Sequence, residues 1–142
     1  MPTINPYLNF NGNCEAAMEF YRSVFGGEFT TFSRFSDMDS GMPVLDNEKN
    51  NILHVSLTIG ENNVIMASDC PSSYGGVTHG TGFSISVGAD SEDEATRVFN
   101  GLSDGGKVTM PLQKTFWGAF FGMWIDKFGV SWMVNYDYPQ ET

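Results

Sequence analysis

The 142-residue sequence predicts one α+β domain, residues 1–142, made of two βαβββ modules. Module one covers about 1–70 and module two about 81–138. Segments with strand-like and helix-like hydrophobic spacing follow in the order strand, helix, three strands, and this order then recurs. Matching residues also recur at a constant offset, since Phe20, Gly26-Gly27 and Thr30 correspond to Phe99, Gly105-Gly106 and Thr109. Because one module alone would leave a sheet face open to water, two modules are expected to bury each other's faces as curved sheets around a central cleft.

The first module is expected to begin with a strand at Ile4–Asn11. A helix follows at Cys14–Phe25, where apolar residues recur at helical spacing, and Gly26-Gly27 ends it. Three strands complete the module, the last two joined as a hairpin: Glu28–Phe35, Ile52–Ile59 and Val64–Asp69. The loop Ser36–Asn51 lies between the first two of these strands, and its length of about fifteen residues is typical of lids and binding loops.

A linker at about 71–80, rich in glycine, leads into the second module. The next strand is expected at Thr81–Gly88, and Ser91 with Glu94 forms a capping box that begins a helix. Gly105-Gly106 ends that helix. Three strands follow, the last two joined by a short turn: Lys107–Pro111, Ala119–Ile125 and Val130–Tyr136.

The composition limits the classes of function. With 7 Lys and Arg against 17 Asp and Glu, the formal net charge is −10, which disfavours nucleic acid and anionic membranes as partners. Apolar residues make up 41%, enough for a core, and no apolar run approaches the roughly 18 residues that suggest a membrane span. No secretory signal is visible, and Cys14 and Cys70 have no metal-type spacing, so a cytoplasmic protein with reduced thiols is expected. Cys14, in the first helical turn, is either a reactive thiolate or a buried thiol.

Several motifs resemble a known family. They are Pro6-Tyr7-Leu8-Asn9-Phe10, Phe25-Gly26-Gly27, Thr115-Phe116-Trp117-Gly118, Phe128-Gly129 and Trp132-Met133-Val134-Asn135. In these motifs the chain is similar to the PhnB-like branch of the vicinal-oxygen-chelate superfamily, which includes glyoxalase I, bleomycin-resistance proteins and extradiol dioxygenases. This branch is also described as demethylubiquinone 3-methyltransferase-like. The resemblance covers nearly the whole chain and implies paired βαβββ modules and a homodimer. A glycine-rich turn that opens a helix, as in most S-adenosylmethionine sites, is not recognisable.

The metal-dependent members of that superfamily imply His and Glu ligands on the first, fourth, fifth and eighth strands. Here the first strand has neither, the fifth and eighth have Phe83 and Met133 at the matching positions, and Asp69 is the only acid of the fourth. We therefore expect no cofactor. An alternative is a divalent metal held by His54, His79 and Asp69, which would make the protein a glyoxalase-, lyase- or dioxygenase-like enzyme with relocated ligands.

Without those ligands, the cleft is expected to bind a small organic molecule. The residues expected to contact it are flat aromatic, methionine or hydrogen-bonding side chains: Trp117, Phe116, Gln113, Ser68, Met133 and Phe83. Aromatic and methionine side chains also fill cores, so a structural dimer with a filled cleft is a further alternative. The sequence leaves open whether any reaction is catalysed.

Overall fold

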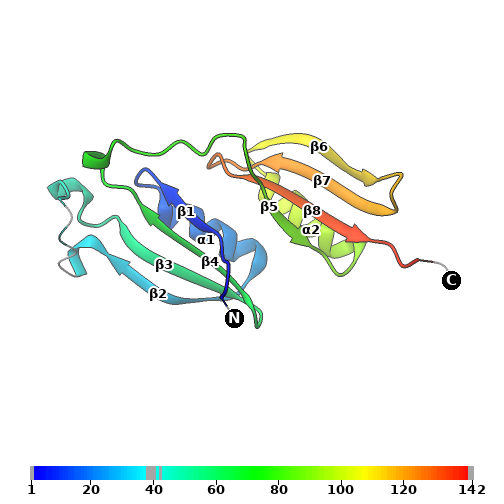
Figure 1. Ribbon diagram of the computed structural model, residues 1–142, viewed down its shortest axis with the longest axis horizontal. Helices are drawn as coiled ribbons and strands as arrows, with labels where there is room; N and C mark the ends of the chain where they lie inside the picture. The colour runs from blue at the N-terminus through cyan, green and yellow to red at the C-terminus, as the bar shows by residue number, and fades with distance from the viewer. Residues whose placement is uncertain (1, 38–40, 42, 141–142) are drawn as a thin grey trace. The chain divides into compact units, whose positions relative to one another are not determined.

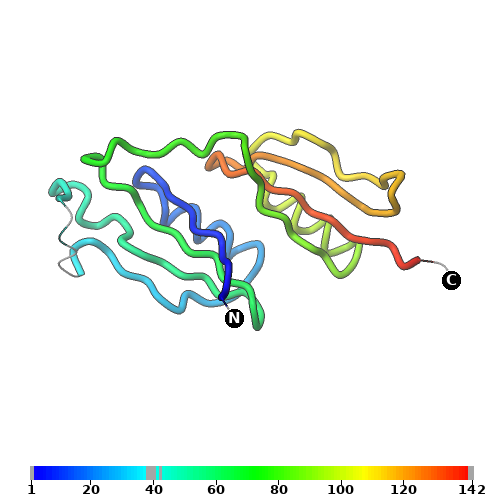
Figure 2. The backbone as a smooth tube through the Cα atoms, viewed as in Figure 1, coloured from blue at the N-terminus to red at the C-terminus, as the bar shows by residue number. Residues whose placement is uncertain are grey.

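The computed structural model describes residues 2–37, 41 and 43–140 (Figures 1 and 2). The elements follow in the order β1 (Tyr7–Phe10), α1 (Cys14–Phe25), β2 (Glu28–Arg34), β3 (Ile52–Ile59), β4 (Asn63–Asp69), β5 (Ile85–Gly88), α2 (Glu92–Ser103), β6 (Lys107–Lys114), β7 (Ala119–Ile125) and β8 (Ser131–Asp137). This order confirms the predicted α+β fold of two repeated modules. The chain divides into two compact units, unit 1 at Met1–Thr78 and unit 2 at His79–Thr142.

Unit 1 is a four-stranded sheet in the order β1-β4-β3-β2, with α1 covering one face (Figure 1). β1 runs parallel to β4, and the other neighbours are antiparallel. Side chains alternate between the two faces of each strand. Those that face α1 form a buried apolar layer: Leu8, Phe10, Val55, Leu57, Ile65 and Ala67. Burial of each of the larger ones contributes about 1.5–3 kcal/mol, so this layer holds the helix on the sheet.

The buried carboxylate of Asp69 connects three segments of unit 1. One of its oxygens accepts the backbone N–H groups of Gly12 and Cys14, both at 2.9 Å, and the other accepts that of Ile52 at 2.8 Å. Asn13 occupies the N-cap position of α1, but its side chain makes no capping hydrogen bond. The start of α1 is therefore satisfied by an acid from β4.

Unit 2 repeats this architecture, with the sheet order β5-β8-β7-β6 and α2 over one face (Figure 1). The predicted capping box is only half formed: Ser91 Oγ accepts the backbone N–H of Glu94 at 3.0 Å, but the Glu94 carboxylate accepts the backbone N–H of Asp90 at 3.1 Å in place of that of Ser91. A Cβ on Gly122 would lie 2.8 Å from the ring of Phe99, and that ring meets Trp124 edge-on at 5.3 Å between centroids. Gly122 and Trp124 therefore face α2, and their neighbours on β7 face away.

The same close packing requires a glycine after the helix in both units. A Cβ on Gly27 would lie 2.3 Å from the carbonyl oxygen of Thr58, and one on Gly106 would lie 2.2 Å from that of Ile125. In each unit the chain leaves the helix directly against the backbone of a hairpin strand. The offset noted in the sequence thus reflects one packing requirement, met twice.

Some boundaries differ from the predicted ones. β1 begins at Tyr7, because Pro6 supplies only a carbonyl to the ladder with β4. β5 begins at Ile85, where its register with β8 starts, so Phe83 precedes the strand and is 63% exposed. The predicted loop Ser36–Asn51 includes the 3₁₀ turn η2 (Asp46–Glu48), while 38–40 and 42 lie outside the described residues. None of the helices in the described ranges is long and apolar enough to cross a membrane.

Candidate functional site

Each unit has a helix on one face of its sheet. We call the opposite face of each sheet its open face. Side chains on the open face alternate along the strands with the core residues, and most of them are half-buried. The open faces therefore carry the sheet side chains that the helices do not cover.

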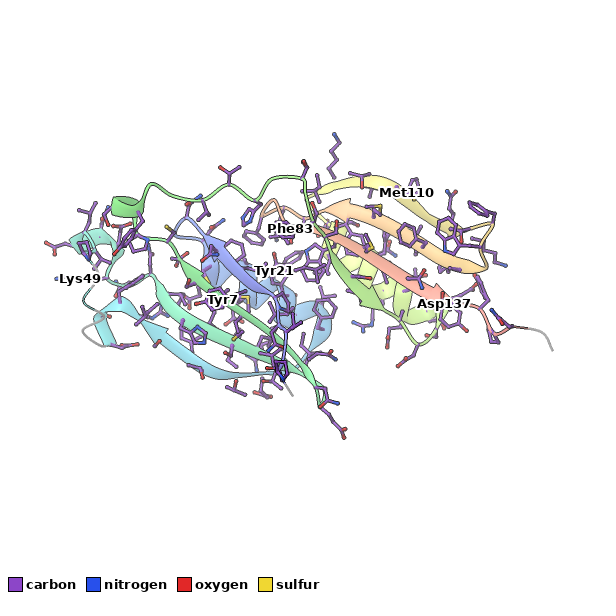
Figure 3. The ribbon with its side chains drawn as sticks, viewed as in Figure 1. Tyr7, Tyr21, Lys49, Phe83, Met110 and Asp137 are labelled. Carbon is purple, nitrogen blue, oxygen red and sulfur yellow. The ribbon has the colours of Figure 1, made fainter. Side chains whose placement is uncertain are left out.

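The open face of unit 2 is aromatic and rich in methionine. Met123 on β7 lies opposite both Met110 on β6 and Met133 on β8, and Figure 3 labels Met110 on its strand. Phe121 precedes it on the same face of β7, between Gln113 of β6 and Asn135 of β8. These cross-strand neighbours form a continuous apolar strip with an amide side chain on either side.

Trp117 extends this strip from the β6–β7 turn. Its ring meets Phe121 edge-on at 5.7 Å between centroids, and Phe116 meets Trp117 edge-on at 5.0 Å. Trp117 is 54% exposed and Phe116 is 97% exposed. We call Trp117, Phe121, Met123 and Met133 the aromatic–methionine strip.

The predicted ligand residues separate into two groups. Trp117, Phe116, Gln113 and Met133 come together on or beside the strip of unit 2. Ser68 lies on the open face of unit 1, on β4. Phe83, which is labelled in Figure 3, precedes β5. Phe121 and Met123 are not among the predicted ligand residues, although the alternation along β7 places both on the face of Met133.

The open face of unit 1 is polar. The hydroxyl of Tyr7 lies 3.0 Å from Nδ1 of His54, and the two rings stack with 5.6 Å between centroids. Nε2 of the same imidazole lies 3.2 Å from Oγ of Ser56. Met66 lies opposite both Tyr7 and Ser56 in the sheet register. His54 is therefore held between two hydroxyl groups by both of its ring nitrogens.

The metal alternative requires donor side chains that face one site. Asp69 faces α1, and both of its oxygens already accept backbone N–H groups. His54 faces the other way on the same sheet, and His79 belongs to unit 2. No group of three His, Cys, Asp or Glu side chains that could hold a metal ion is found among the residues that the structure describes. The three residues of the alternative therefore do not fit a shared site within unit 1.

The strand positions implied by the metal-dependent relatives do not fit either. Their open-face side chains are hydroxyl, amide, phenol and thioether groups: Tyr7 and Asn9 on β1, Met66 and Ser68 on β4, Ser86 on β5, and Met133 and Asn135 on β8. Asp137 ends β8 and accepts a hydrogen bond from the Asn135 amide at 2.9 Å. These groups differ from the imidazole and carboxylate donors that suit a divalent transition metal.

The thiol of Cys14 is buried at the start of α1. Burial raises the pKa of this thiol well above its ordinary value, and the nearby carboxylates of Asp69 and Glu15 raise it further. These effects outweigh the helix terminus, which would favour a thiolate. Of the two readings of Cys14, the geometry supports the buried, protonated thiol.

The sequence is similar to that of a known family over most of its length. The sequence profile of the family described as 3-demethylubiquinone-9 3-methyltransferase matches residues 2–135. The chain belongs to this family. Protein YjdN of Escherichia coli (strain K12) is 33% identical, over 98% of this chain and 98% of the relative.

Solved structures of similar proteins agree with this assignment. Protein PA1353 of Pseudomonas aeruginosa is 44% identical, with a TM-score of 0.86 over 96% of this chain and 98% of that one. The PhnB protein of Bacillus cereus is 30% identical, with a TM-score of 0.74 over 95% and 99% of the two chains. A glyoxylase/bleomycin resistance protein/dioxygenase domain from Frankia sp. EAN1pec is 11% identical and covers 99% of this chain and 95% of its own, with a TM-score of 0.70, which shows the shared fold alone. The PhnB-like resemblance and the predicted fold are thereby confirmed.

Proposed function

We propose that this PhnB-like protein binds a small, planar organic molecule on the aromatic–methionine strip of unit 2. The observation that carries the proposal is Trp117, a large apolar side chain that is 54% exposed and held edge-on by Phe121. A ring fixed in this way loses little conformational freedom when a ligand stacks on it.

The neighbours of Trp117 support a flat and mostly apolar ligand. The thioethers of Met123 and Met133 are flexible and polarizable, so they adapt to different aromatic shapes. The amide of Gln113, whose strand position is opposite Phe121, offers both a donor and an acceptor that orient a polar substituent. The net charge of −10 favours neutral or cationic molecules over anions.

The proposal includes neither methyl transfer nor a metal. Gly26-Gly27 ends α1, whereas a glycine-rich cofactor loop opens a helix. We also propose that the chain is a cytoplasmic homodimer, and light scattering on the purified protein would test its oligomeric state.

Thermal shift measurements with defined compounds test the binding proposal. We expect naphthol, quinoline or acridine to raise the Tm of the wild-type protein, because a ligand that binds only the folded state stabilises it. Trp117→Ala should abolish that shift. Tyr74→Ala is the matched control, since Tyr74 is also an aromatic residue with 57% exposure and lies on the 3₁₀ turn η3 (Ser72–Tyr74) of unit 1.

Two results would contradict the proposal. One is an unchanged Tm of the wild type with every compound, which would favour a purely structural protein. The other is an equal shift in the wild type and in Trp117→Ala, which would place any binding away from the strip. Metal analysis of the same preparation tests the alternative of a relocated metal site, since a tightly held metal lost in His54→Ala would support it.

A further inference from the structure

The hydrogen-bonded group of Tyr7, His54 and Ser56 lies on unit 1 and takes no part in the proposed ligand site. β3 supplies His54 and Ser56 two positions apart, so both side chains emerge on the open face. β1 supplies Tyr7, which reaches His54 through the register of the sheet although 47 residues separate them. The result is a linear order of hydroxyl, imidazole and phenol.

These three groups match the three components of an activated nucleophile: a hydroxyl, a base and a group that orients the base. A serine hydroxyl becomes nucleophilic when a base within hydrogen-bond reach takes its proton and a third group orients that base. The 3.2 Å between Ser56 Oγ and His54 Nε2 satisfies the first condition. The 3.0 Å between His54 Nδ1 and the Tyr7 hydroxyl, together with ring stacking, satisfies the second.

We propose that Ser56 is a nucleophile, His54 its general base and Tyr7 the residue that positions the imidazole. In the tautomer required, Nδ1–H donates to the Tyr7 hydroxyl oxygen, and the Ser56 hydroxyl donates to Nε2. The ligand class is a small activated ester or another acyl donor with a good leaving group. No metal ligand is needed for this chemistry.

The surroundings of the group suit a small and mostly apolar acyl donor. Ser56 is 8% exposed, Tyr7 is 43% exposed, and the thioether-bearing Met66 lies opposite both in the register. The nucleophile is therefore screened from bulk water, while the phenol at the other end of the group is accessible. Screening of this kind strengthens the hydrogen bonds that align the serine.

The reaction balances without a redox partner. Ser56 Oγ forms a bond to the carbonyl carbon of the ester, and its proton passes to His54 Nε2. The ester C–O bond breaks, and the leaving alcohol takes that proton. Water then hydrolyses the acyl-serine through the same imidazole, which releases the acid and restores the hydroxyl.

Covalent labelling of the full chain tests the proposal. An alkyl fluorophosphonate forms a P–O bond to an activated serine and releases fluoride, so the intact mass rises by one adduct for each chain. We expect peptide mapping to place this adduct on Ser56, and we expect slow release of p-nitrophenol from p-nitrophenyl acetate. His54→Gln should lower the labelling rate by about a hundredfold, the typical contribution of a general base.

Two further variants separate this chemistry from a structural role. Tyr7→Phe keeps the stacked ring and removes only the hydroxyl, so it should slow labelling without a change in the circular dichroism spectrum. Ser68→Ala removes a serine from the same open face, and labelling should persist. An adduct on Tyr7, an unlabelled wild-type protein, or equal labelling of the wild type and the folded variant Ser56→Ala would each overturn the proposal.

Discussion

Replacement of Asp69 by asparagine is expected to destabilise unit 1 strongly. The side chain is only 3% exposed, and its two oxygens accept three backbone N–H groups, those of Gly12, Cys14 and Ile52. Asparagine retains one carbonyl oxygen, which can keep the pair of bonds at Gly12 and Cys14. Its amide nitrogen would then face the N–H of Ile52, a fully buried residue.

The expected loss of stability follows from these hydrogen bonds. A hydrogen bond to a charged group contributes about 1.5–3 kcal/mol, and a buried donor without a partner costs about 1–3 kcal/mol. Because these terms overlap, Asp69→Asn should lower the free energy of unfolding by about 2–4 kcal/mol. Asp69→Ala should lower it further, since all three donors lose their acceptor.

Urea denaturation followed by far-ultraviolet circular dichroism measures this change. Tryptophan fluorescence is less suitable, because Trp117, Trp124 and Trp132 all belong to unit 2. Asp46→Asn is the matched control, since the Asp46 side chain is 97% exposed and the same substitution should cost no more than about 0.5 kcal/mol. If Asp69→Asn shifts the midpoint no more than this control does, Asp69 does not hold the three segments together.

Two other predictions test the packing and the charges. Gly106→Ala should lower the free energy of unfolding by about 2 kcal/mol or more, because the new Cβ would lie 2.2 Å from the carbonyl oxygen of Ile125. Gly88→Ala is the control and should not destabilise the protein, because a Cβ on Gly88 would have no atom within 4 Å. The hydrogen bond and charge of Arg34 lower the pKa of Glu15. This partly exposed pair therefore stabilises the fold at pH values above the ordinary Glu pKa, and the stabilisation is lost as the pH falls through the lowered pKa. The difference in Tm between the wild type and Glu15→Gln should thus be small, largest near neutral pH, and absent in strong acid.

Local sequence patterns predict the elements that depend on local chemistry. The helix Cys14–Phe25 and the strands Ile52–Ile59 and Ala119–Ile125 have their predicted bounds, because hydrophobic period and glycine stops define them. β5 is shorter than predicted. Residues 81–84 continue the strand-like pattern of β5 toward the N-terminus, but a strand also needs a partner, and the ladder with β8 starts only at Ile85.

Of the two residues proposed to act with His54, one has a local sequence signal and the other does not. Ser56 is two residues from His54, and strand alternation was sufficient to place both on one face. Tyr7 is 47 residues away from His54, and only the parallel pairing of β1 with β4 brings it near. The backbone N–H groups of Gly12 and Cys14 donate to Asp69 across 57 and 55 residues, so a single sequence contains no local signal for these bonds.

The alternation along β3 has a consequence for how this chain tolerates insertions. A single residue added or deleted at the start of β3, before His54, would slip the strand by one position and move every following side chain to the opposite face of the sheet. His54 and Ser56 would then point into the apolar layer beneath α1, and Val55 with Leu57 would meet water. The gain or loss of one codon there would remove both the proposed nucleophile and the stability of unit 1 in a single step, whereas substitutions can alter either property separately.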